Sequence, residues 1–360
     1  MNASADNTPS RREWLNATAR TTRRGGFWIP GEDLSTPFGT VQRGPMWVEW
    51  EAPATTPAHP LPVILVHGGG GQGTDWMITP DGRPGWAPNL VDNGFEVYVV
   101  DRPGHGRSPN HPQVLGRPGA PFPAEAASSL FAPSDAADTH TRWPWGRSLS
   151  DPEMVALRAS TGHLLADLSE SQCLDGERLA SLLDLVGPAI LITHSAGAPS
   201  GWLAADLRPD LVAGILAVEP IGPPFAGPPG LAPLRYGLTA APLRTDPPLP
   251  VTELPARVGE YCVSGLRGTP VRVVTGGASP AADGARAIAA HLEATGADTD
   301  HLHLPDEGID GNGHGLIFES NSRELAALAT EWLTTVTQRT PSTGSRTPLS
   351  IASNTGKDSL

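Results

Sequence analysis

The sequence contains few cysteines and few charged residues, and its apolar runs are short. Only Cys173 and Cys262 occur among 360 residues, too few for a disulfide framework or for a cysteine-based zinc site of the usual four ligands. We expect both thiols to be buried, because free cysteine is among the most buried residue types. The longest apolar runs, residues 62–66 and 211–218, have the length of a strand and cannot cross a bilayer. A soluble protein is therefore expected.

The net charge of the chain indicates which partners it can bind, and its N-terminal residues indicate its location in the cell. Charged residues make up only 18% of the chain, and 25 basic against 38 acidic side chains give a net charge of -13. Such a surface repels phosphate backbones and anionic lipids, so neither nucleic acid nor membrane is expected as a partner. Two arginine pairs occur near the N-terminus, at 11–12 and 23–24, but no apolar segment of signal-peptide length follows either pair. We predict a cytoplasmic protein.

Glycine and proline are abundant, at 41 and 39 residues, which indicates a globular protein with long, stiff loops. Apolar runs of strand length alternate with helical patterns. The expected strands are 46–50, 62–66, 95–100, 189–193, 211–218, 271–274 and 301–304, and the clearest expected helices are 198–206, 281–294 and 322–336. Continuous Val, Ile and Leu runs separated by helices predict an α/β fold with a buried, mostly parallel sheet flanked by helices.

Two long interruptions break this alternation. Residues 108–185 stand where one crossover helix would suffice, and their helical pattern at 154–168 predicts an ordered, inserted lid. Residues 221–268 form a second, proline-rich insertion. We predict one domain over residues 26–337, with disordered tails at 1–25 and 338–360.

The first chemical motif is the run 193–197, T-H-S-A-G, which follows an expected strand and leads into a helix. It matches a nucleophile elbow, in which a sharp turn lifts Ser195 above the sheet and the helix N-terminus behind it stabilises a developing oxyanion. Thr193 replaces the usual first glycine. The alternative is an ordinary strand-to-helix turn with a serine near the N-cap.

A glycine-rich loop at 66–73, V-H-G-G-G-G-Q-G, follows an earlier strand. It satisfies the dinucleotide pattern G-x-G-x-x-G, but that fold needs a helix to open at the third glycine, and no helical period starts before about Trp86. A Walker A loop is excluded because Thr74 stands where the lysine must be. We interpret the run as an oxyanion loop in which the N–H of Gly69 lies beside that of Ala196. A flexible glycine turn without a catalytic part is the alternative.

A histidine and a carboxylate complete the candidate set. His314 lies in the glycine-rich run 310–315, D-G-N-G-H-G, after the last expected strand, from which it can reach Ser195 as a general base. Two acids are candidates. Asp283 follows the strand at 271–274 but falls inside a helical pattern, whereas Glu219 ends the preceding strand, where a buried carboxylate needs a partner. We favour Glu219 and keep Asp283 as the alternative.

The order of serine, acid and histidine, with the segments 64–73 and 101–108 (D-R-P-G-H-G-R-S), resembles the α/β-hydrolase superfamily. Within it, residues 27–337 are similar to a bacterial esterase group with a Ser-Glu-His triad, whose Glu follows the sixth strand in a Val-Glu-Pro context. The resemblance implies an α/β-hydrolase fold in which Ser195 is the nucleophile and Glu219 orients His314.

The same resemblance implies that Gly69 and Ala196 form the oxyanion hole. Where some members of the group carry two adjacent cysteines in this loop, the present chain has Gly69 and Gly70. No special rigidity or secretion associated with that cysteine pair is therefore implied.

The expected activity is that of a serine ester hydrolase, a carboxylesterase acting on a small-molecule ester through an acyl-enzyme without a metal or organic cofactor. A serine at the elbow argues against haloalkane dehalogenases and epoxide hydrolases, which use aspartate there. Lactonase, thioesterase and amidase activities stay open, as does a non-catalytic ligand-binding protein on the same scaffold. Trp143 and Trp145, in the first insertion with Phe122 and Phe131, are candidates for substrate binding or for simple packing. Oligomeric state and natural substrate are not encoded in these motifs.

Overall fold

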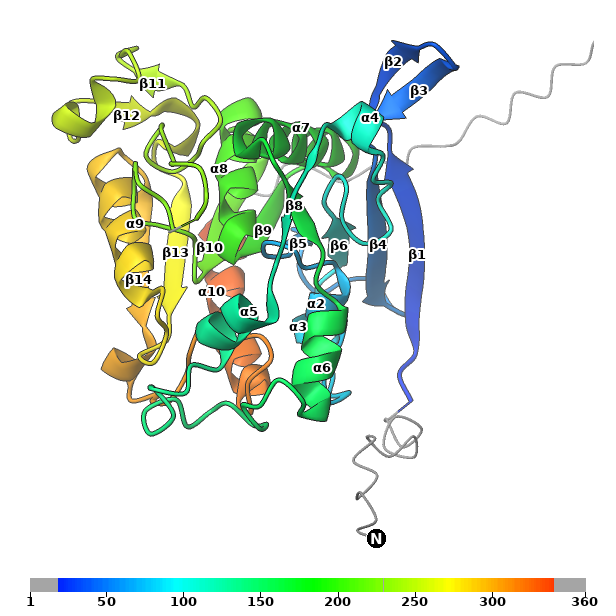
Figure 1. Cartoon of the computed structure of the whole chain (residues 1–360), viewed down its shortest axis with the longest axis vertical. Coiled ribbons are helices and arrows are strands. Elements are labelled where there is room, and N and C mark those ends of the chain that lie inside the picture. Colours follow the sequence, from blue (N-terminus) through cyan, green and yellow to red (C-terminus); the bar gives the residue numbers. More distant parts are fainter. Residues whose placement is uncertain (1–18, 229, 340–360) are drawn as a thin grey trace, which may run out of the picture.

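A computed structural model describes residues 19–228 and 230–339 and contains a central sheet of eight strands, whose arrangement can be followed in Figure 1. Their order in space is β1-β4-β6-β5-β9-β10-β13-β14, with β1 and β4 antiparallel to their neighbours and the others parallel. The strands span Thr22–Ile29 (β1), Met46–Pro53 (β4), Val63–Val66 (β5), Val97–Asp101 (β6), Ala189–His194 (β9), Val212–Val218 (β10), Pro270–Thr275 (β13) and Asp298–His303 (β14). The expected mostly parallel sheet is confirmed.

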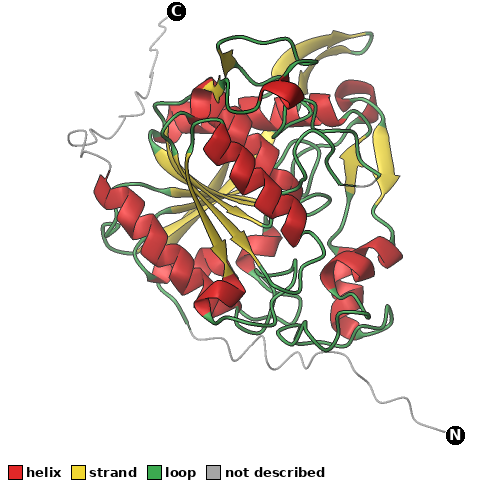
Figure 2. Cartoon of the chain, turned by 90° about the vertical axis from the view of Figure 1, so that its left-hand side faces the viewer, coloured by secondary structure: helices red, strands yellow, loops and turns green. Residues whose placement is uncertain are grey.

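Helices cover both faces of the sheet (Figure 2). One face packs against α7 (Leu168–Val186), α8 (Ala198–Leu207) and α9 (Ala282–Ala294), and the other against α3 (Trp86–Asp92) and α10 (Ser322–Arg339). A short helix, α2 (Thr74–Met77), follows the glycine-rich loop, and a hairpin of β2 (Glu32–Thr36) and β3 (Gly39–Arg43) projects from the edge near β1 (Figure 1).

Side chains of the central strands alternate between the two faces. In β5, Ile64 and Val66 pack toward α7, α8 and α9, while Val63 and Leu65 pack toward α3 and α10. All four are fully buried. A strand covered on both faces is apolar over most of its length, which explains why these strands appear in the sequence as nearly continuous runs of Val, Ile and Leu.

The first insertion runs from the end of β6 to the start of α7. It contains α4 (Pro112–Leu115), β7 (Pro118–Pro121), α5 (Ala124–Phe131), α6 (Pro152–Ala159) and β8 (His163–Leu165), with β7 and β8 paired antiparallel. The expected insertion, 108–185, included α7, but α7 packs on α8 in the helical layer of the sheet. The inserted segment therefore ends at about residue 167.

The continuous helix expected over 154–168 is wrong, because the chain changes direction twice within it. α6 ends at Ala159, and Gly162 then donates its N–H to the carbonyl of Gly70 at 2.6 Å. A new helix starts at Leu168, where the Asp167 carboxylate accepts the N–H of Glu170 at 3.0 Å. This is an N-cap bond, and it separates α7 from α6.

Other expectations differ in smaller ways. β1 begins at Thr22, before the domain boundary expected at residue 26, and residues 1–18 and 340–360 of the two expected tails lie outside the described residues. The second insertion contains a two-stranded sheet of β11 (Thr245–Asp246) and β12 (Cys262–Val263). Cys173 and Cys262 are unpaired and half-buried rather than fully buried. In the described residues, no helix combines the length and the apolarity that a membrane span requires.

Candidate active site

Ser195 lies on a sharp turn between β9 and α8. Its φ of 51° is in the left-handed region, which L-residues with side chains occupy at a cost in free energy and which is found at functional sites. A 3-10 turn, Ser195–Gly197, leads directly into α8. At Gly197, a Cβ atom would lie only 2.3 Å from the carbonyl oxygen of His67, so only glycine lets the two loops approach this closely. The elbow expected from the sequence is present.

The unusual Thr193 is accommodated by a glycine on the following helix. A Cβ atom on Gly201 would lie 3.1 Å from Cγ2 of Thr193, closer than most real contacts of a Cβ. Thr193 is fully buried at the end of β9. The space that the first glycine of the usual elbow motif provides is thus supplied by a glycine of α8, eight residues after Thr193.

Three side chains from distant parts of the chain form a hydrogen-bonded series. The Nε2 atom of His314 lies 3.0 Å from Oγ of Ser195, and its Nδ1 atom lies 3.3 Å from Oε2 of Glu219. His314 is 2% exposed and Ser195 8% exposed. In this arrangement one imidazole nitrogen can accept the serine proton while the other donates to the carboxylate.

Glu219 is fully buried and is held by further donors. Its Oε1 accepts the N–H of Gly276 at 2.6 Å, and its Oε2 accepts the hydroxyl of Ser279 at 2.6 Å. It directly follows β10 with a φ of 48°, one of three positive φ values outside glycine in the described residues. Asp283, the alternative acid, is exposed in the first turn of α9. The structure therefore brings Glu219, not Asp283, to His314.

The glycine-rich loop lies beside the elbow. A Cβ atom on Gly69 would be 3.0 Å from the Cβ of Ala196 and 3.7 Å from Leu164 of β8. Within the described residues, no backbone carbonyl accepts the N–H of Gly69. A short helix does begin at the third glycine, because Gly73 is the N-cap of α2, so the expectation that no helix starts before about Trp86 is wrong. α2 ends at Met77 after only four residues, however, and it is not the long crossover helix of a dinucleotide-binding unit.

The histidines next to the site are kept neutral by burial. Burial, together with a smaller effect of the neighbouring His314, lowers the pKa of His194 to about 3. His194 Nε2 lies 3.1 Å from the carbonyl oxygen of His314, and a neutral ring that carries its proton on Nε2 donates to that oxygen. His194 therefore supports the backbone of His314 and adds no positive charge beside it.

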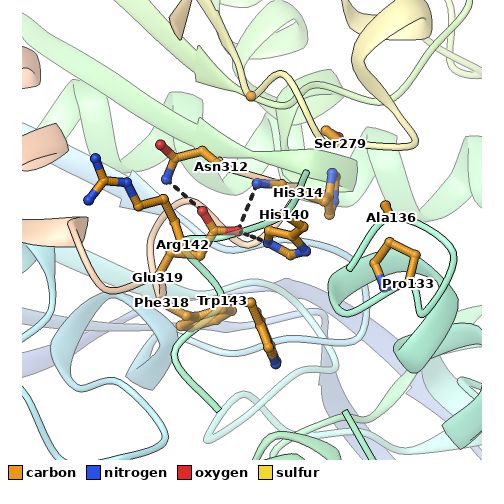
Figure 3. A network of polar contacts seen from close by, with 12 residues as sticks. Pro133, Ala136, His140, Arg142, Trp143, Ser279, Asn312, His314, Phe318 and Glu319 are labelled. Atoms are coloured by element: carbon orange, nitrogen blue, oxygen red, sulfur yellow. Dashed lines mark hydrogen bonds and ion pairs between the residues drawn. The ribbon is translucent and has the colours of Figure 1, made fainter. Parts of the chain in front are cut away.

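A second buried carboxylate holds the loop that carries His314 (Figure 3). Glu319 is fully buried, and its Oε1 accepts the N–H of Gly313 at 2.9 Å and faces Nε2 of His140 at 2.8 Å. Its Oε2 accepts the side-chain amide of Asn312 at 2.6 Å. Because His140 belongs to the first insertion, Glu319 ties the insertion to the loop immediately before His314.

The aromatic residues of the insertion lie near the same loop. The ring of Phe131 is 5.5 Å from that of His314, and a Cβ atom on Gly315 would lie 3.3 Å from Trp143 and 3.5 Å from Phe131. Trp143 is 6% exposed, and its ring contacts that of Trp145 edge-on at 4.8 Å. Trp145 is half-buried and donates its Nε1–H to Asp81 at 3.1 Å.

Several residues around the site were not found by the sequence analysis. Ser279 and His140 carry no local motif, and they meet the site only through contacts between segments far apart in the chain. Glu319 lies only six residues after Gly313, whose N–H it accepts, but no motif marks it in the sequence. The one available signal was the glycine-flanked Asn312, two residues before His314. In the described residues, no group of three or more His, Cys, Asp or Glu side chains could hold a metal ion.

Comparisons with known proteins agree with this architecture. The family model of the alpha/beta hydrolase fold matches residues 62–236. A fungal protein described as a probable secreted lipase, phiG (Fungal sp., strain ATCC 74256), is 34% identical over 326 residues, which cover 82% of this chain and 87% of that protein. A solved structure described as a novel bacterial esterase is 24% identical and superposes with a TM-score of 0.65, covering 89% of this chain and 98% of the other. The chain therefore belongs to the alpha/beta hydrolase fold family and is an esterase- or lipase-like hydrolase by homology.

Proposed function

We propose that the protein is a serine ester hydrolase of the carboxylesterase type that acts through an acyl-enzyme. The observation that carries the proposal is the series from Glu219 through His314 to Ser195, with separations of 3.3 Å and 3.0 Å. The backbone N–H groups of Gly69 and Ala196, on adjacent loops, are the proposed oxyanion donors. This set contains a nucleophile, a base, a group that orients the base and two oxyanion donors, as acyl transfer requires.

In the proposed reaction, Oγ of Ser195 attacks the ester carbonyl and Nε2 of His314 takes the hydroxyl proton. The tetrahedral oxyanion is stabilised by the N–H groups of Gly69 and Ala196. Collapse breaks the bond to the alkoxide, which leaves as the alcohol with the proton from His314. Water then attacks the acyl-enzyme by the same steps in reverse order and releases the acid.

Alternatives on the same scaffold differ in the leaving group or lack turnover altogether. A lactonase, thioesterase or amidase would use the same three side chains, so the geometry favours none of them over an esterase, whereas the fungal relative described as a lipase favours ester substrates. A non-catalytic ligand-binding protein does not need a strained serine, and the φ of 51° at Ser195 argues against it. The cytoplasmic location stays a prediction from the sequence.

Covalent labelling tests the proposal directly. We expect a fluorophosphonate to form a single adduct on Ser195, located by mass spectrometry of the digested protein, and to abolish hydrolysis of short-chain p-nitrophenyl esters in parallel. Heat-denatured protein is the control, because a serine is nucleophilic only beside its base. Native protein that neither hydrolyses the esters nor forms the adduct would contradict the proposed function and favour the ligand-binding alternative.

We further propose that the side chains of Phe131, Trp143 and Trp145 line the substrate site. Phe131→Ala is expected to change the ranking of kcat/KM among esters of differing bulk by about tenfold, because its ring is half-buried beside His314. At least one of Trp143→Ala and Trp145→Ala should also change this ranking. Trp143→Ala should in addition lower the melting temperature, since truncating a buried tryptophan costs about 3–5 kcal/mol.

The control for these variants is Trp28→Ala, because Trp28 is 47% exposed on the edge strand β1. It should leave both the ranking and the melting temperature nearly unchanged. A uniform loss across all esters that follows the fall in melting temperature would assign the insertion aromatics to packing alone.

A further inference from the structure

The peptide unit between Gly68 and Gly69 is held from its carbonyl side. Three donors converge on the carbonyl oxygen of Gly68: a guanidinium N–H of Arg102 at 2.8 Å, Nδ1 of His67 at 2.9 Å and the N–H of Gly71 at 3.3 Å. This peptide is not among the cis bonds of the described residues. In a trans peptide the C=O and the following N–H point in opposite directions. Fixing the oxygen of Gly68 therefore fixes the direction of the Gly69 N–H, the proposed oxyanion donor.

The hydrogen bonds of His67 fix the tautomer of its ring. Its Nε2 accepts the backbone N–H of Arg102 at 3.1 Å, so the single proton of the neutral ring must be on Nδ1, where it donates to Gly68. Burial and the charge of Arg102 lower the pKa of His67 well below its ordinary value. His67 therefore stays neutral and keeps this tautomer.

Arg102 is in turn aimed by a carboxylate on α7. Its other terminal nitrogen donates to Asp175 at 2.8 Å, and the two side chains are 2% and 1% exposed. Two buried atoms of the pair, Nε of Arg102 and Oδ1 of Asp175, find no partner among the described residues. A buried ion pair whose hydrogen bonds are incomplete contributes little to the stability of the fold. We therefore infer that the role of Asp175 is to orient the guanidinium of Arg102.

We propose that Arg102 and Asp175 are positioning residues for the oxyanion hole: Asp175 aims the guanidinium of Arg102, which holds the Gly68 carbonyl so that the Gly69 N–H faces the oxyanion. A charged donor on the carbonyl also polarises the peptide and makes its N–H a stronger donor. The inference rests on the proposed function, because it assigns a role within that same reaction. Arg102 follows β6 directly, and within the part of the chain that the structure describes no hydrogen bond joins its side chain to Ser195.

The test compares Arg102→Lys and the double variant Arg102→Met/Asp175→Leu with the wild type. Lysine keeps a charge beside Asp175 but lacks the planar fork that reaches two acceptors, and the double variant removes both charges so that none is buried alone. We expect kcat to fall about 100-fold in each, as for the loss of one oxyanion donor, with KM changed less than about threefold. The pH dependence of kcat should stay the same, because the contacts of His314 and Glu219 are untouched.

A second readout separates the oxyanion hole from general damage. Each protein is assayed on an ester and on its thionoester, in which sulfur replaces the carbonyl oxygen. Sulfur is a weak hydrogen-bond acceptor, so the wild type should prefer the oxygen ester. This preference should shrink about tenfold or more in both variants if the Gly69 N–H is misdirected. A loss of folded protein would lower both rates equally.

Arg178 provides the matched control, because it is also a buried arginine that donates hydrogen bonds to a backbone carbonyl and to a carboxylate. It donates to the oxygen of Gly44 at 2.8 Å and to Glu32 at 2.5 Å. Arg178→Lys should lose stability without changing the ester-to-thionoester ratio. If the wild type is active and the Arg102 variants keep its ratio, the inference is overturned while the proposed function stands. If the wild type is inactive and unlabelled by fluorophosphonate, the proposed function fails, and the inference fails with it.

Discussion

Ser195→Ala is expected to lower kcat for ester hydrolysis by about 10⁵-fold or more, because loss of the nucleophile removes the acyl-enzyme route altogether. The fold should be retained. Among residues 19–228 and 230–339, the hydroxyl of Ser195 hydrogen-bonds only to His314, and alanine retains the Cβ atom that packs near Gly68. Activity on p-nitrophenyl esters and the far-ultraviolet circular dichroism spectrum check the two halves of this expectation.

Ser200→Ala is the matched control, because Ser200 is a buried serine on α8 five residues further along. Its hydroxyl donates to the carbonyl of Gly197 at 2.5 Å and, in the described structure, forms no hydrogen bond with His314. Ser200→Ala should keep fluorophosphonate labelling and most of the activity. Near-normal hydrolysis by cleanly purified Ser195→Ala would remove Ser195 from the mechanism.

The parallel core of the fold could be predicted because its strands are buried on both faces. Such strands carry few polar residues, so β5, β9 and β10 appear as mainly apolar runs that locate them to within a residue or two. The insertion was harder. The helical pattern at 154–168 is interrupted by the contact between Gly162 and Gly70, residues 92 positions apart in sequence, and no local pattern encodes a contact of that kind.

The residues of the candidate site also fall into those that the sequence predicts and those that it does not. Ser195, His314 and Glu219 each occur with a local signal, namely a turn between strand and helix, a glycine-rich loop and a carboxylate at the end of an apolar strand. The side chains that position these residues and the oxyanion loop have no such local signal. Glu319 and His140 lie 179 residues apart in sequence, and Arg102 and Asp175 lie 73 apart, so their pairing follows from the tertiary structure alone.

The two buried carboxylates of the site have different partners and hence different tasks. Glu219 faces the imidazole of His314 itself, whereas Glu319 binds the backbone of Gly313 and the side chains of Asn312 and His140. Only a carboxylate in contact with the ring can stabilise the imidazolium that forms in the reaction. Glu319 can set the position of the loop but cannot replace Glu219.

Glu219→Gln is therefore expected to lower kcat by about 10³- to 10⁴-fold, while Asp283→Asn should change it by less than about twofold. In the wild type, Oε2 of Glu219 accepts from Ser279 and faces Nδ1 of His314. A glutamine NH₂ group at that position can donate to the Ser279 hydroxyl, but it then presents a donor to Nδ1. The ring responds by carrying its proton on Nε2, the tautomer that cannot take the proton of Ser195.

The comparison is matched because both substitutions exchange one carboxylate for its amide isostere, one buried beside His314 and the other exposed on α9. Ser279→Ala provides an intermediate case. It removes one of the three donors to Glu219 but leaves the carboxylate and the Gly276 N–H in place, so we expect kcat to fall about tenfold, the equivalent of about 1.4 kcal/mol. Steady-state kinetics on one ester, with melting temperatures measured in parallel, show which of the three variants loses the most kcat. If Asp283→Asn instead caused the larger loss, the acid would be at the conventional position after β13, and the His314–Glu219 contact would be structural only.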